Sequence, residues 1–167
     1  MLAATKLWQE SIMSYLLASR SVEVAVPVER VFSYAANLEN YSAWFPGVLS
    51  IRAKDSRALD EIGKAYEEIV SVPFGKSVKV LIRVVEASYP ERLVTEGDLR
   101  VLLPRMELSF QALDDNKTLM EWRMYSRRQG KLAGLLLPLF RLVLQSRSRY
   151  ALIRLKTMLE GHERPGG

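Results

Sequence analysis

Apolar and polar residues alternate along much of the chain with a period of two, the spacing of a half-buried β-strand. Val78, Val80 and Ile82 fall on one face of such a strand. Lys79 and Arg83 fall on the other face. With the turn residues between them, such patterns predict strands over residues 21–26, 48–53, 65–72, 76–87, 93–97, 101–113 and 118–126. Because one face of each strand is apolar, we expect an antiparallel sheet with one buried face.

Residues with helical spacing flank the predicted strands. Pro27 leads into a predicted helix over residues 28–36. Residues 40–45 predict a second short turn of helix, which ends at Pro46 and Gly47.

A long amphipathic helix is predicted at the end of the chain, beginning near Lys131 and bent or restarted at Pro138. At about 100° per residue its apolar side chains gather on one face, which we expect to pack on the sheet. This stripe consists of Leu137, Phe140, Leu144, Ser148, Ala151, Leu152, Leu155 and Leu159. Strands and helices do not alternate as βαβ units. The pattern therefore predicts an α+β fold, in which a curved antiparallel sheet wraps around the C-terminal helix, with two short helices after the first strand.

The length of 167 residues fits one domain. We expect this domain to span residues 20–161, followed by a disordered tail over 162–167. Residues 1–19 are expected to form an extension, in which the spacing over residues 3–17 predicts an amphipathic helix.

The composition narrows the possible chemistry. The chain has no Cys, and its one His is His162, in the polar tail. Thiolate or multi-histidine metal sites and catalytic triads with histidine are therefore excluded. The glycine-rich phosphate-binding motifs G-x-x-x-x-G-K-[ST] and G-x-G-x-x-G are both absent from the sequence. We expect no cofactor and no metal.

The charge is uneven, because the net charge of +5 comes with a strongly basic segment from Arg123 to Arg164. Lipid headgroups, an acidic ligand or RNA are compatible partners for such a segment, as is plain solvation of a helix face. No apolar run is long enough to cross a membrane. We therefore expect a cytoplasmic protein that can associate with the membrane surface.

The last helix carries a second apolar stripe on its far side, formed by Leu139, Val143, Tyr150 and Ile153. Basic residues flank it, Arg147 and Arg154 on one edge and Arg149 and Lys156 on the other. The simpler expectation is that a second copy of the chain, or the extension through Leu7, Trp8, Ile12 and Leu16, covers this stripe. The alternative is contact with an anionic membrane surface.

Several short segments together resemble the START-like (SRPBCC) superfamily, in its polyketide cyclase/dehydrase and coenzyme-Q-binding branch. They are Val26-Pro27-x-x-Arg30-Val31-Phe32, Asn37-Leu38-x-x-Tyr41-x-x-Trp44-x-Pro46-Gly47-Val48, Gly63, Tyr89-Pro90-Glu91-Arg92-Leu93 and Leu152-x-x-Leu155-Lys156-x-x-x-Glu160. The resemblance covers residues 20–161 and implies a helix-grip fold around an apolar cavity. Members of this superfamily bind lipids, quinones, sterols or polyketides; some are cyclases or aromatases and some associate with ribosomes. The resemblance implies no catalytic residue.

The inward faces of the predicted strands and last helix supply the candidate ligand contacts, if sheet and helix do not meet fully. These are Trp44, Phe45, Tyr66, Val80, Ile82, Leu108, Phe110, Met120, Trp122, Met124, Phe140, Arg141 and Leu144. The alternative is that these side chains simply form the core, and for Trp44 a structural role is the simpler expectation. Arg141 falls within the apolar stripe, where it could contact a polar head group, reach out to solvent or pair with a carboxylate of the sheet.

Glu68 and Tyr66 are the weak catalytic candidates, because alternation places both on one face of their strand. A carboxyl group in an apolar cavity would have a raised pKa and could act as an acid or as a ligand anchor. The simpler expectation is a one-residue shift in register that exposes Glu68 to solvent.

The leading hypothesis is binding or transport of a hydrophobic small molecule (a lipid, a quinone or a polyketide-like compound) in a hollow between the sheet and the last helix. Its entrance is expected between residues 132–144 and the loops around Trp44 and Phe74. A polyketide cyclase or aromatase that uses Glu68 or Tyr66 is the alternative, so enzyme activity stays undecided, with binding favoured. A ribosome- or RNA-associated protein ranks third, because no aromatic residues interleave with the basic ones.

Overall fold

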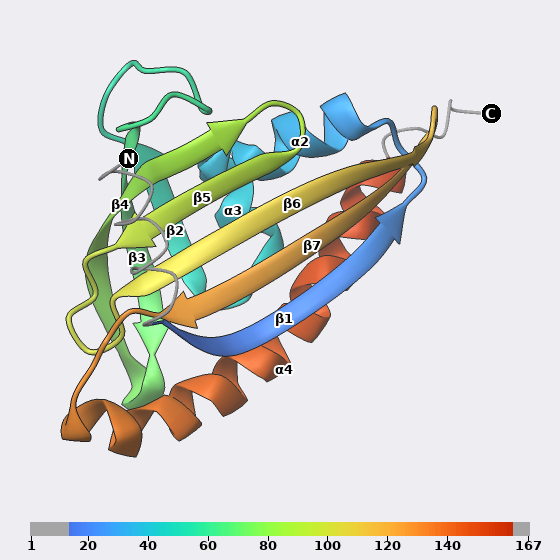
Figure 1. Cartoon of the computed structure of the whole chain (residues 1–167). Helices are drawn as coiled ribbons and strands as arrows, with labels where there is room; N and C mark the ends of the chain where they lie inside the picture. The colour runs from blue at the N-terminus through green and yellow to red at the C-terminus, as the bar shows by residue number, and fades with distance from the viewer. Residues whose placement is uncertain (1–13, 162–167) are drawn as a thin grey trace, which may run out of the picture.

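A computed structural model describes residues 14–161, apart from the side chains at 131–133. Strands and short helices come first, and one long helix ends the fold (Figure 1). The elements are β1 (Tyr15–Val24), α2 (Val28–Ala36), η1 (Leu38–Asn40), α3 (Tyr41–Trp44), β2 (Val48–Ala53), β3 (Ala65–Val72), η2 (Pro73–Gly75), β4 (Lys76–Ser88), β5 (Arg92–Gly97), β6 (Pro104–Asp114), β7 (Lys117–Ser126) and α4 (Lys131–Gly161). Among the described residues, no helix is long and apolar enough to cross a membrane.

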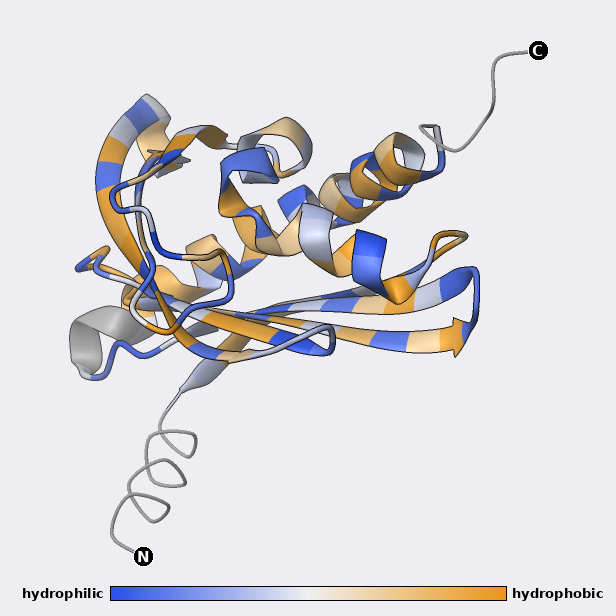
Figure 2. Cartoon of the chain, turned by 90° about the horizontal axis from the view of Figure 1, so that it is seen from above, coloured by the Kyte–Doolittle hydropathy of each residue, from blue (hydrophilic) through white to orange (hydrophobic). Residues whose placement is uncertain are grey.

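The strands form one seven-stranded antiparallel sheet in the order β1-β7-β6-β5-β4-β3-β2. From β2 to β7, strands that follow one another in sequence are paired, and β1 lies beside β7, so the first and last strands are neighbours. The helices lie on one side of this curved sheet (Figure 2). On that side α4 packs against β1, and α2 packs against β6 and β7. The predicted helix-grip architecture is confirmed.

The core lies between the inner face of the sheet and the helices. Met106, Leu108 and Phe110 alternate along β6 and are all buried. Leu152 and Leu155, on the predicted stripe of α4, are buried as well. Each large apolar side chain buried in this way contributes about 1.5–3 kcal/mol. The predicted packing of α4 on the sheet is therefore confirmed and supplies a large share of the stability.

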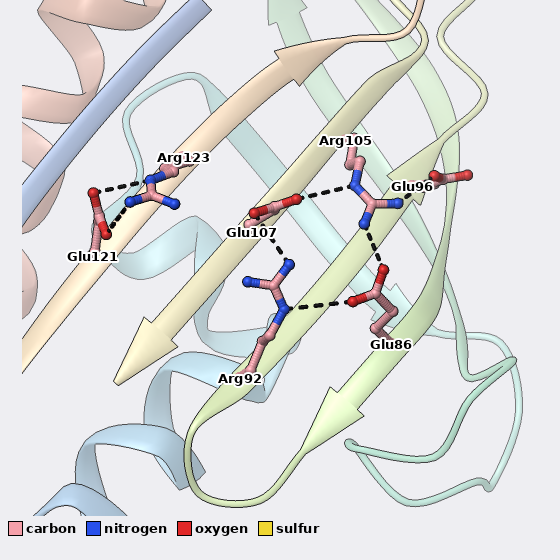
Figure 3. Close-up of polar contacts among 7 residues, drawn as sticks. All are labelled: Glu86, Arg92, Glu96, Arg105, Glu107, Glu121 and Arg123. Carbon is pink, nitrogen blue, oxygen red and sulfur yellow. Dashed lines mark hydrogen bonds and ion pairs between the residues drawn. The ribbon is translucent and has the colours of Figure 1, made fainter. Parts of the chain in front are cut away.

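The outer face of the sheet is covered by charged side chains (Figure 3). Arg105 on β6 contacts Glu86 at 2.6 Å, Glu96 at 2.9 Å and Glu107 at 3.1 Å, on three neighbouring strands. Arg92 extends the network through Glu107 at 3.2 Å. Apart from the Arg105–Glu107 pair within β6, these pairs lie across strands, where opposite charges support the register. The apolar side chains of the sheet therefore gather on the opposite, inner face.

The first strand differs from the sequence prediction, since β1 begins at Tyr15 rather than 21 and ends at Val24 rather than 26. Tyr15 pairs with Ser126, so the start of β1 is fixed by its partner strand β7 rather than by local spacing. The predicted helix over residues 3–17 lies mostly outside the described residues, and its last part, 15–17, is strand.

The start of β6 and the course of α4 at Pro138 also differ from the prediction. β6 begins at Pro104 rather than 101, because the chain first turns at Leu103, which has a φ of 45°. Pro138 lies inside α4, which continues without a restart. Tertiary packing of its apolar stripe holds the helix where proline removes one backbone hydrogen bond.

Candidate ligand-binding site

Glu68 lies on the inner face of β3 and is buried, with 7% of its surface exposed. Its neighbour Glu67 points the opposite way and forms ion pairs with Lys54 at 3.3 Å and Lys79 at 3.1 Å. The simpler sequence expectation, that Glu68 is exposed, is therefore wrong. The register is set by the pairing of Glu68 with Val80 of β4, which places both side chains on the buried face.

A small cavity lies beside the Glu68 carboxyl group and measures about 40 Å³. It is lined by Leu38, Tyr41, Glu68, Ile82, Thr95, Gly97, Pro104, Met106 and Met124. Small-molecule pockets usually measure about 300–1,000 Å³, so this space is far smaller than a bound ligand. The sequence expectation of a ligand-sized hollow at this place is therefore not met in this conformation. Side chains from η1, α3 and five strands converge there and fill the space.

The environment of Glu68 is unusual for a carboxyl group. Burial raises its pKa to about 7. Within the described residues it has no hydrogen-bond or ion-pair partner. A group that titrates near neutral pH can donate a hydrogen bond in its protonated form and accept one in its ionised form.

Two hydroxyl groups share the cavity with Glu68. Tyr41 accepts a hydrogen bond from Nε1 of Trp122 at 3.2 Å, and burial, aided by the charge of Glu68, raises its pKa well above the usual value. Thr95 of β5 is also buried. The cavity is thus an apolar pocket with three convergent polar groups, an arrangement that suits one polar end of a ligand.

Tyr66, the second catalytic candidate, is buried on the same face of β3. Burial, with the charges of Glu39 and Asp55, raises its pKa to about 12. It stays protonated near neutral pH, and it is not among the residues that line the cavity. The structure therefore favours Glu68 over Tyr66 as a proton-exchanging group.

Three of the predicted ligand contacts pack together with Tyr41 in a buried aromatic cluster. They are Trp44, Phe45 and Trp122. Trp44 is fully buried, with its ring 4.8 Å from that of Tyr41, and Phe45 lies 5.1 Å from Trp122. The Nε1 atom of Trp44 is buried and has no hydrogen-bond partner within the described residues. The cluster reaches the cavity through Tyr41 alone among its members.

Other predicted contacts divide between the cavity and the core. Ile82 and Met124 line the cavity, as predicted for an inner face. Phe110 packs with Phe32 of α2 at 5.3 Å between ring centroids. Val80, Leu108, Met120 and Leu144 belong to the same core or pack against it.

An apolar groove of about 230 Å³ opens between the beginning of α4 and the β3–β4 turn. It is lined by Val72, Pro73, Phe74, Val78, Leu99, Val101, Leu136, Leu139 and Phe140. Phe74 is 87% exposed at the tip of this turn. The sequence placed the entrance between residues 132–144 and the Phe74 loop, and the groove lies there. Trp44, expected at the same entrance, lies in the aromatic cluster.

The groove and the cavity lie along the same inner face of β3 and β4. Val72 in the groove is four residues from Glu68, which corresponds to about 13 Å along a strand. Val70 and Val80 face inward between them. Leu99, Met124 and Leu144 contact both the main core and the small cluster of Leu17, Leu102 and Phe140. Together with Val70 and Val80 they separate the groove from the cavity, and we call these five side chains the barrier.

Of two basic residues of α4, Arg141 follows one of the alternatives left open by the sequence, and Arg147 differs from the prediction. Arg141 is exposed, because a long side chain at the edge of the stripe reaches solvent. Arg147 is half-buried rather than part of an outer basic row: it donates a hydrogen bond to the carbonyl of Ser71 at 2.8 Å and lies against Gly47. Burial lowers its pKa.

Two hydroxyl-bearing residues that line the Glu68 cavity were not among the candidates predicted from the sequence. Tyr41 was noticed only as part of the family resemblance, and Thr95 carried no signal. Thr95 reaches the cavity because β5 pairs between β4 and β6, which strand alternation alone does not establish.

Comparison with solved structures places the fold among known proteins. The chain is similar to the Zhui aromatase/cyclase from Streptomyces sp. R1128, with a TM-score of 0.74 and 16% identity over 92% of this chain and 98% of that one. It is also similar to a START superfamily protein from Mycobacterium smegmatis, with a TM-score of 0.68 and 16% identity over 87% and 97% of the chains. A two-domain aromatase/cyclase, StfQ from the steffimycin biosynthetic pathway, matches with a TM-score of 0.68 and 14% identity over 96% of this chain and 55% of that one. No curated protein matches the sequence.

The sequence profile of one family matches residues 16–160, which is most of the chain. That range begins one residue after the start of β1 and ends one residue before the end of α4. The matched region therefore contains the groove, the cavity and the barrier between them. The chain belongs to the family described as polyketide cyclase/dehydrase and lipid transport.

Proposed function

We propose that this protein binds a hydrophobic small molecule between α4 and the sheet, with the apolar body in the groove and one end at the Glu68 cavity. The observation that carries the proposal is the apolar groove, which lies on the same inner face of β3 and β4 as the buried carboxyl group of Glu68 and is separated from it by the barrier side chains. A lipid, a quinone or a polyketide-like compound has the size and polarity for such a path.

Desolvation supplies the binding energy. A ligand that buries about 200 Å² of apolar surface gains about 5 kcal/mol, before the cost of immobilising it. The groove is lined almost entirely by aliphatic and aromatic side chains, so little polar surface has to be dehydrated.

Access to the cavity requires movement of the barrier side chains. Met124 and Leu144 are only partly buried, and both contact the small cluster at the groove end. Methionine adapts to irregular apolar shapes because its side chain is unbranched and flexible. Binding is therefore expected to displace these side chains rather than to fill an existing hollow.

A second candidate function is a cyclase or aromatase reaction on a polyketide-like chain. The specific observation in its favour is the Glu68 carboxyl group, whose pKa is raised to about 7 beside the Tyr41 hydroxyl group. A group that titrates near the working pH is suited to general acid–base catalysis. Two of the similar structures are described as aromatase/cyclases.

The exposed part of the second stripe of α4 is Tyr150 and Ile153. Contact with an anionic membrane surface or with a second copy of the chain stays a prediction for these residues. Sedimentation with vesicles of anionic phospholipid and analytical ultracentrifugation of the wild type and a Tyr150→Ser/Ile153→Ser variant would test the two possibilities.

Native mass spectrometry of the freshly purified full chain tests the proposed function, with solvent extraction to identify any bound compound. We expect an apolar compound on the wild type. Leu136→Glu places a carboxylate in the groove and should abolish its retention. Leu142→Glu, on the exposed side of α4, is the matched control and should retain it. No bound compound in any sample, or equal retention by the two variants, contradicts a ligand site in the groove.

Turnover separates the two candidate functions. If the protein is a cyclase that uses Glu68, Glu68→Gln abolishes cyclisation of a poly-β-ketone probe while the probe still binds. If the wild type binds such a probe and never converts it, the enzyme hypothesis is wrong and binding alone stands.

A further inference from the structure

We infer that the ligand is uncharged and carries a carbonyl or hydroxyl oxygen on the end that reaches Glu68, and that Glu68 selects against carboxylates. This inference deepens the proposed function and rests on it. The groove alone would accept any apolar compound, so the selectivity has to come from the inner end of the path.

Three oxygen-bearing side chains define that inner end. Glu68, Tyr41 and Thr95 come from β3, α3 and β5, and all are at least nine-tenths buried. The remaining lining is apolar side chains and Gly97. A hydrogen-bonding group of a ligand that enters this cavity therefore meets these three side chains and no others of its kind within the described residues.

Of the two ionisable members of this set, Glu68 is the one without a partner in the described part of the chain, since Tyr41 accepts a hydrogen bond from Trp122. Its carboxyl group makes no hydrogen bond or ion pair within the described part of the chain, and its neighbours across the strands are Ile51 and Val80. A buried polar group without a partner costs about 1–3 kcal/mol, which a ligand oxygen would recover by bonding to it.

The charges around Glu68 disfavour an anionic ligand. Tyr41 is the other titratable group that lines the cavity. Lys79 points to the outer face, where it pairs with Glu67, and Arg147 of α4 is engaged with Ser71 near the end of β3. A ligand carboxylate would thus enter a low-dielectric site without a lining cation in the described region and would meet Glu68 itself.

The protonation state of Glu68 decides which hydrogen bond forms. Because burial raises its pKa to about 7, the carboxyl group is mostly protonated at pH 6 and mostly ionised at pH 8. The protonated form donates to a ligand carbonyl, and the ionised form cannot. Affinity for a ketone should therefore fall with rising pH.

Three probes of the same size and shape test the inference: 2-acetylnaphthalene, which is a neutral ketone, 2-isopropylnaphthalene, which is a hydrocarbon, and 2-naphthoate, which is an anion. Their affinities for the full chain are measured by isothermal titration calorimetry at pH 6 and pH 8. At pH 6 we expect the ketone to bind about threefold to tenfold more tightly than the hydrocarbon, the value of one hydrogen bond. From pH 6 to pH 8 its affinity should fall up to about tenfold, following the protonated fraction of Glu68. The anion should bind most weakly at pH 8.

Variants at two neighbouring positions identify the group responsible. Glu68→Gln keeps a donor at every pH, so ketone affinity should become independent of pH and the anion should bind about tenfold more tightly at pH 8 than to the wild type. Glu68→Leu should lose the preference for the ketone. Glu67→Gln, on the opposite face, should behave as the wild type.

The outcomes separate the two proposals. Equal affinity of the wild type for ketone and hydrocarbon, or tight binding of the anion at pH 8, overturns the inference and leaves the proposed function standing. Binding of none of the three probes contradicts the proposed function, and the inference with it.

Discussion

Replacing Glu68 by glutamine should remove a large pH dependence from the free energy of unfolding. Burial raises the pKa of Glu68 from its usual 4.5 to about 7 in the folded protein. The folded state therefore binds a proton that the unfolded state releases between these values. Stability from this group is present below pH 4.5 and is lost as the pH rises through 7.

The size of this loss follows from the two pKa values. At about 1.4 kcal/mol per pKa unit, a pKa of 7 in place of 4.5 corresponds to about 3 kcal/mol. In the difference between the free energies of unfolding of the wild type and Glu68→Gln, the contributions of the other titrating groups cancel. Relative to the variant, the wild type should thus lose about 3 kcal/mol between pH 4.5 and pH 8.

The free energy of unfolding of both proteins is measured by urea denaturation, followed by far-UV circular dichroism, at intervals of half a pH unit. Glu67→Gln is the matched control with the opposite sign. Hydrogen bonds from Lys79 and Lys54 lower the pKa of Glu67, so its contribution to stability appears as the pH rises. If the curves for wild type and Glu68→Gln run parallel across this range, Glu68 is not buried without a partner and the reasoning is refuted.

Other substitutions test the packing around the site. Trp122→Phe removes the hydrogen bond to Tyr41 and part of a buried ring, and should lower the free energy of unfolding by about 2 kcal/mol in urea denaturation; an unchanged midpoint would contradict the role of this bond. Gly47→Ala should cost about 1–3 kcal/mol by the same assay, because Gly47 has a φ of 94° and an added methyl group would collide with the Arg147 guanidinium; wild-type stability would show that the turn and Arg147 can relax. Arg105→Met removes a cation whose side chain is 19% exposed and leaves three carboxylates facing one another, so thermal unfolding should begin earlier, with a loss of about 2 kcal/mol at low salt; an effect that does not shrink with added salt would argue against electrostatics.

Much of the fold could be predicted because local patterns and tertiary structure agree. The turns at Pro73–Gly75 and 114–117, and the two faces of β4, follow from the sequence alone. β1 shows the limit, since its first residues become strand only by pairing with β7. The same holds for Arg147, whose helical position suggested solvent while Ser71 and Gly47 offered a buried contact.

The candidate site was only partly predictable. Alternation placed Tyr66 and Glu68 on one face, but which face was buried depended on the register with β4. The place of the groove was predicted from the turn at Phe74 and the apolar beginning of α4. The volume of the interior depends on how side chains from seven elements interlock, and no sequence pattern encodes that.

The central claim is that an apolar ligand passes from the groove to the Glu68 cavity. Methyl NMR of 13C-labelled methionine tests it most directly, because Met106 and Met124 line the cavity and Met158 lines a different surface groove near α2. Titration with 2-acetylnaphthalene should shift the methyl signals of Met106 and Met124 and leave Met158 unchanged. Shifts at Met158 alone, or no shift at Met106 and Met124 at saturation, would contradict the account.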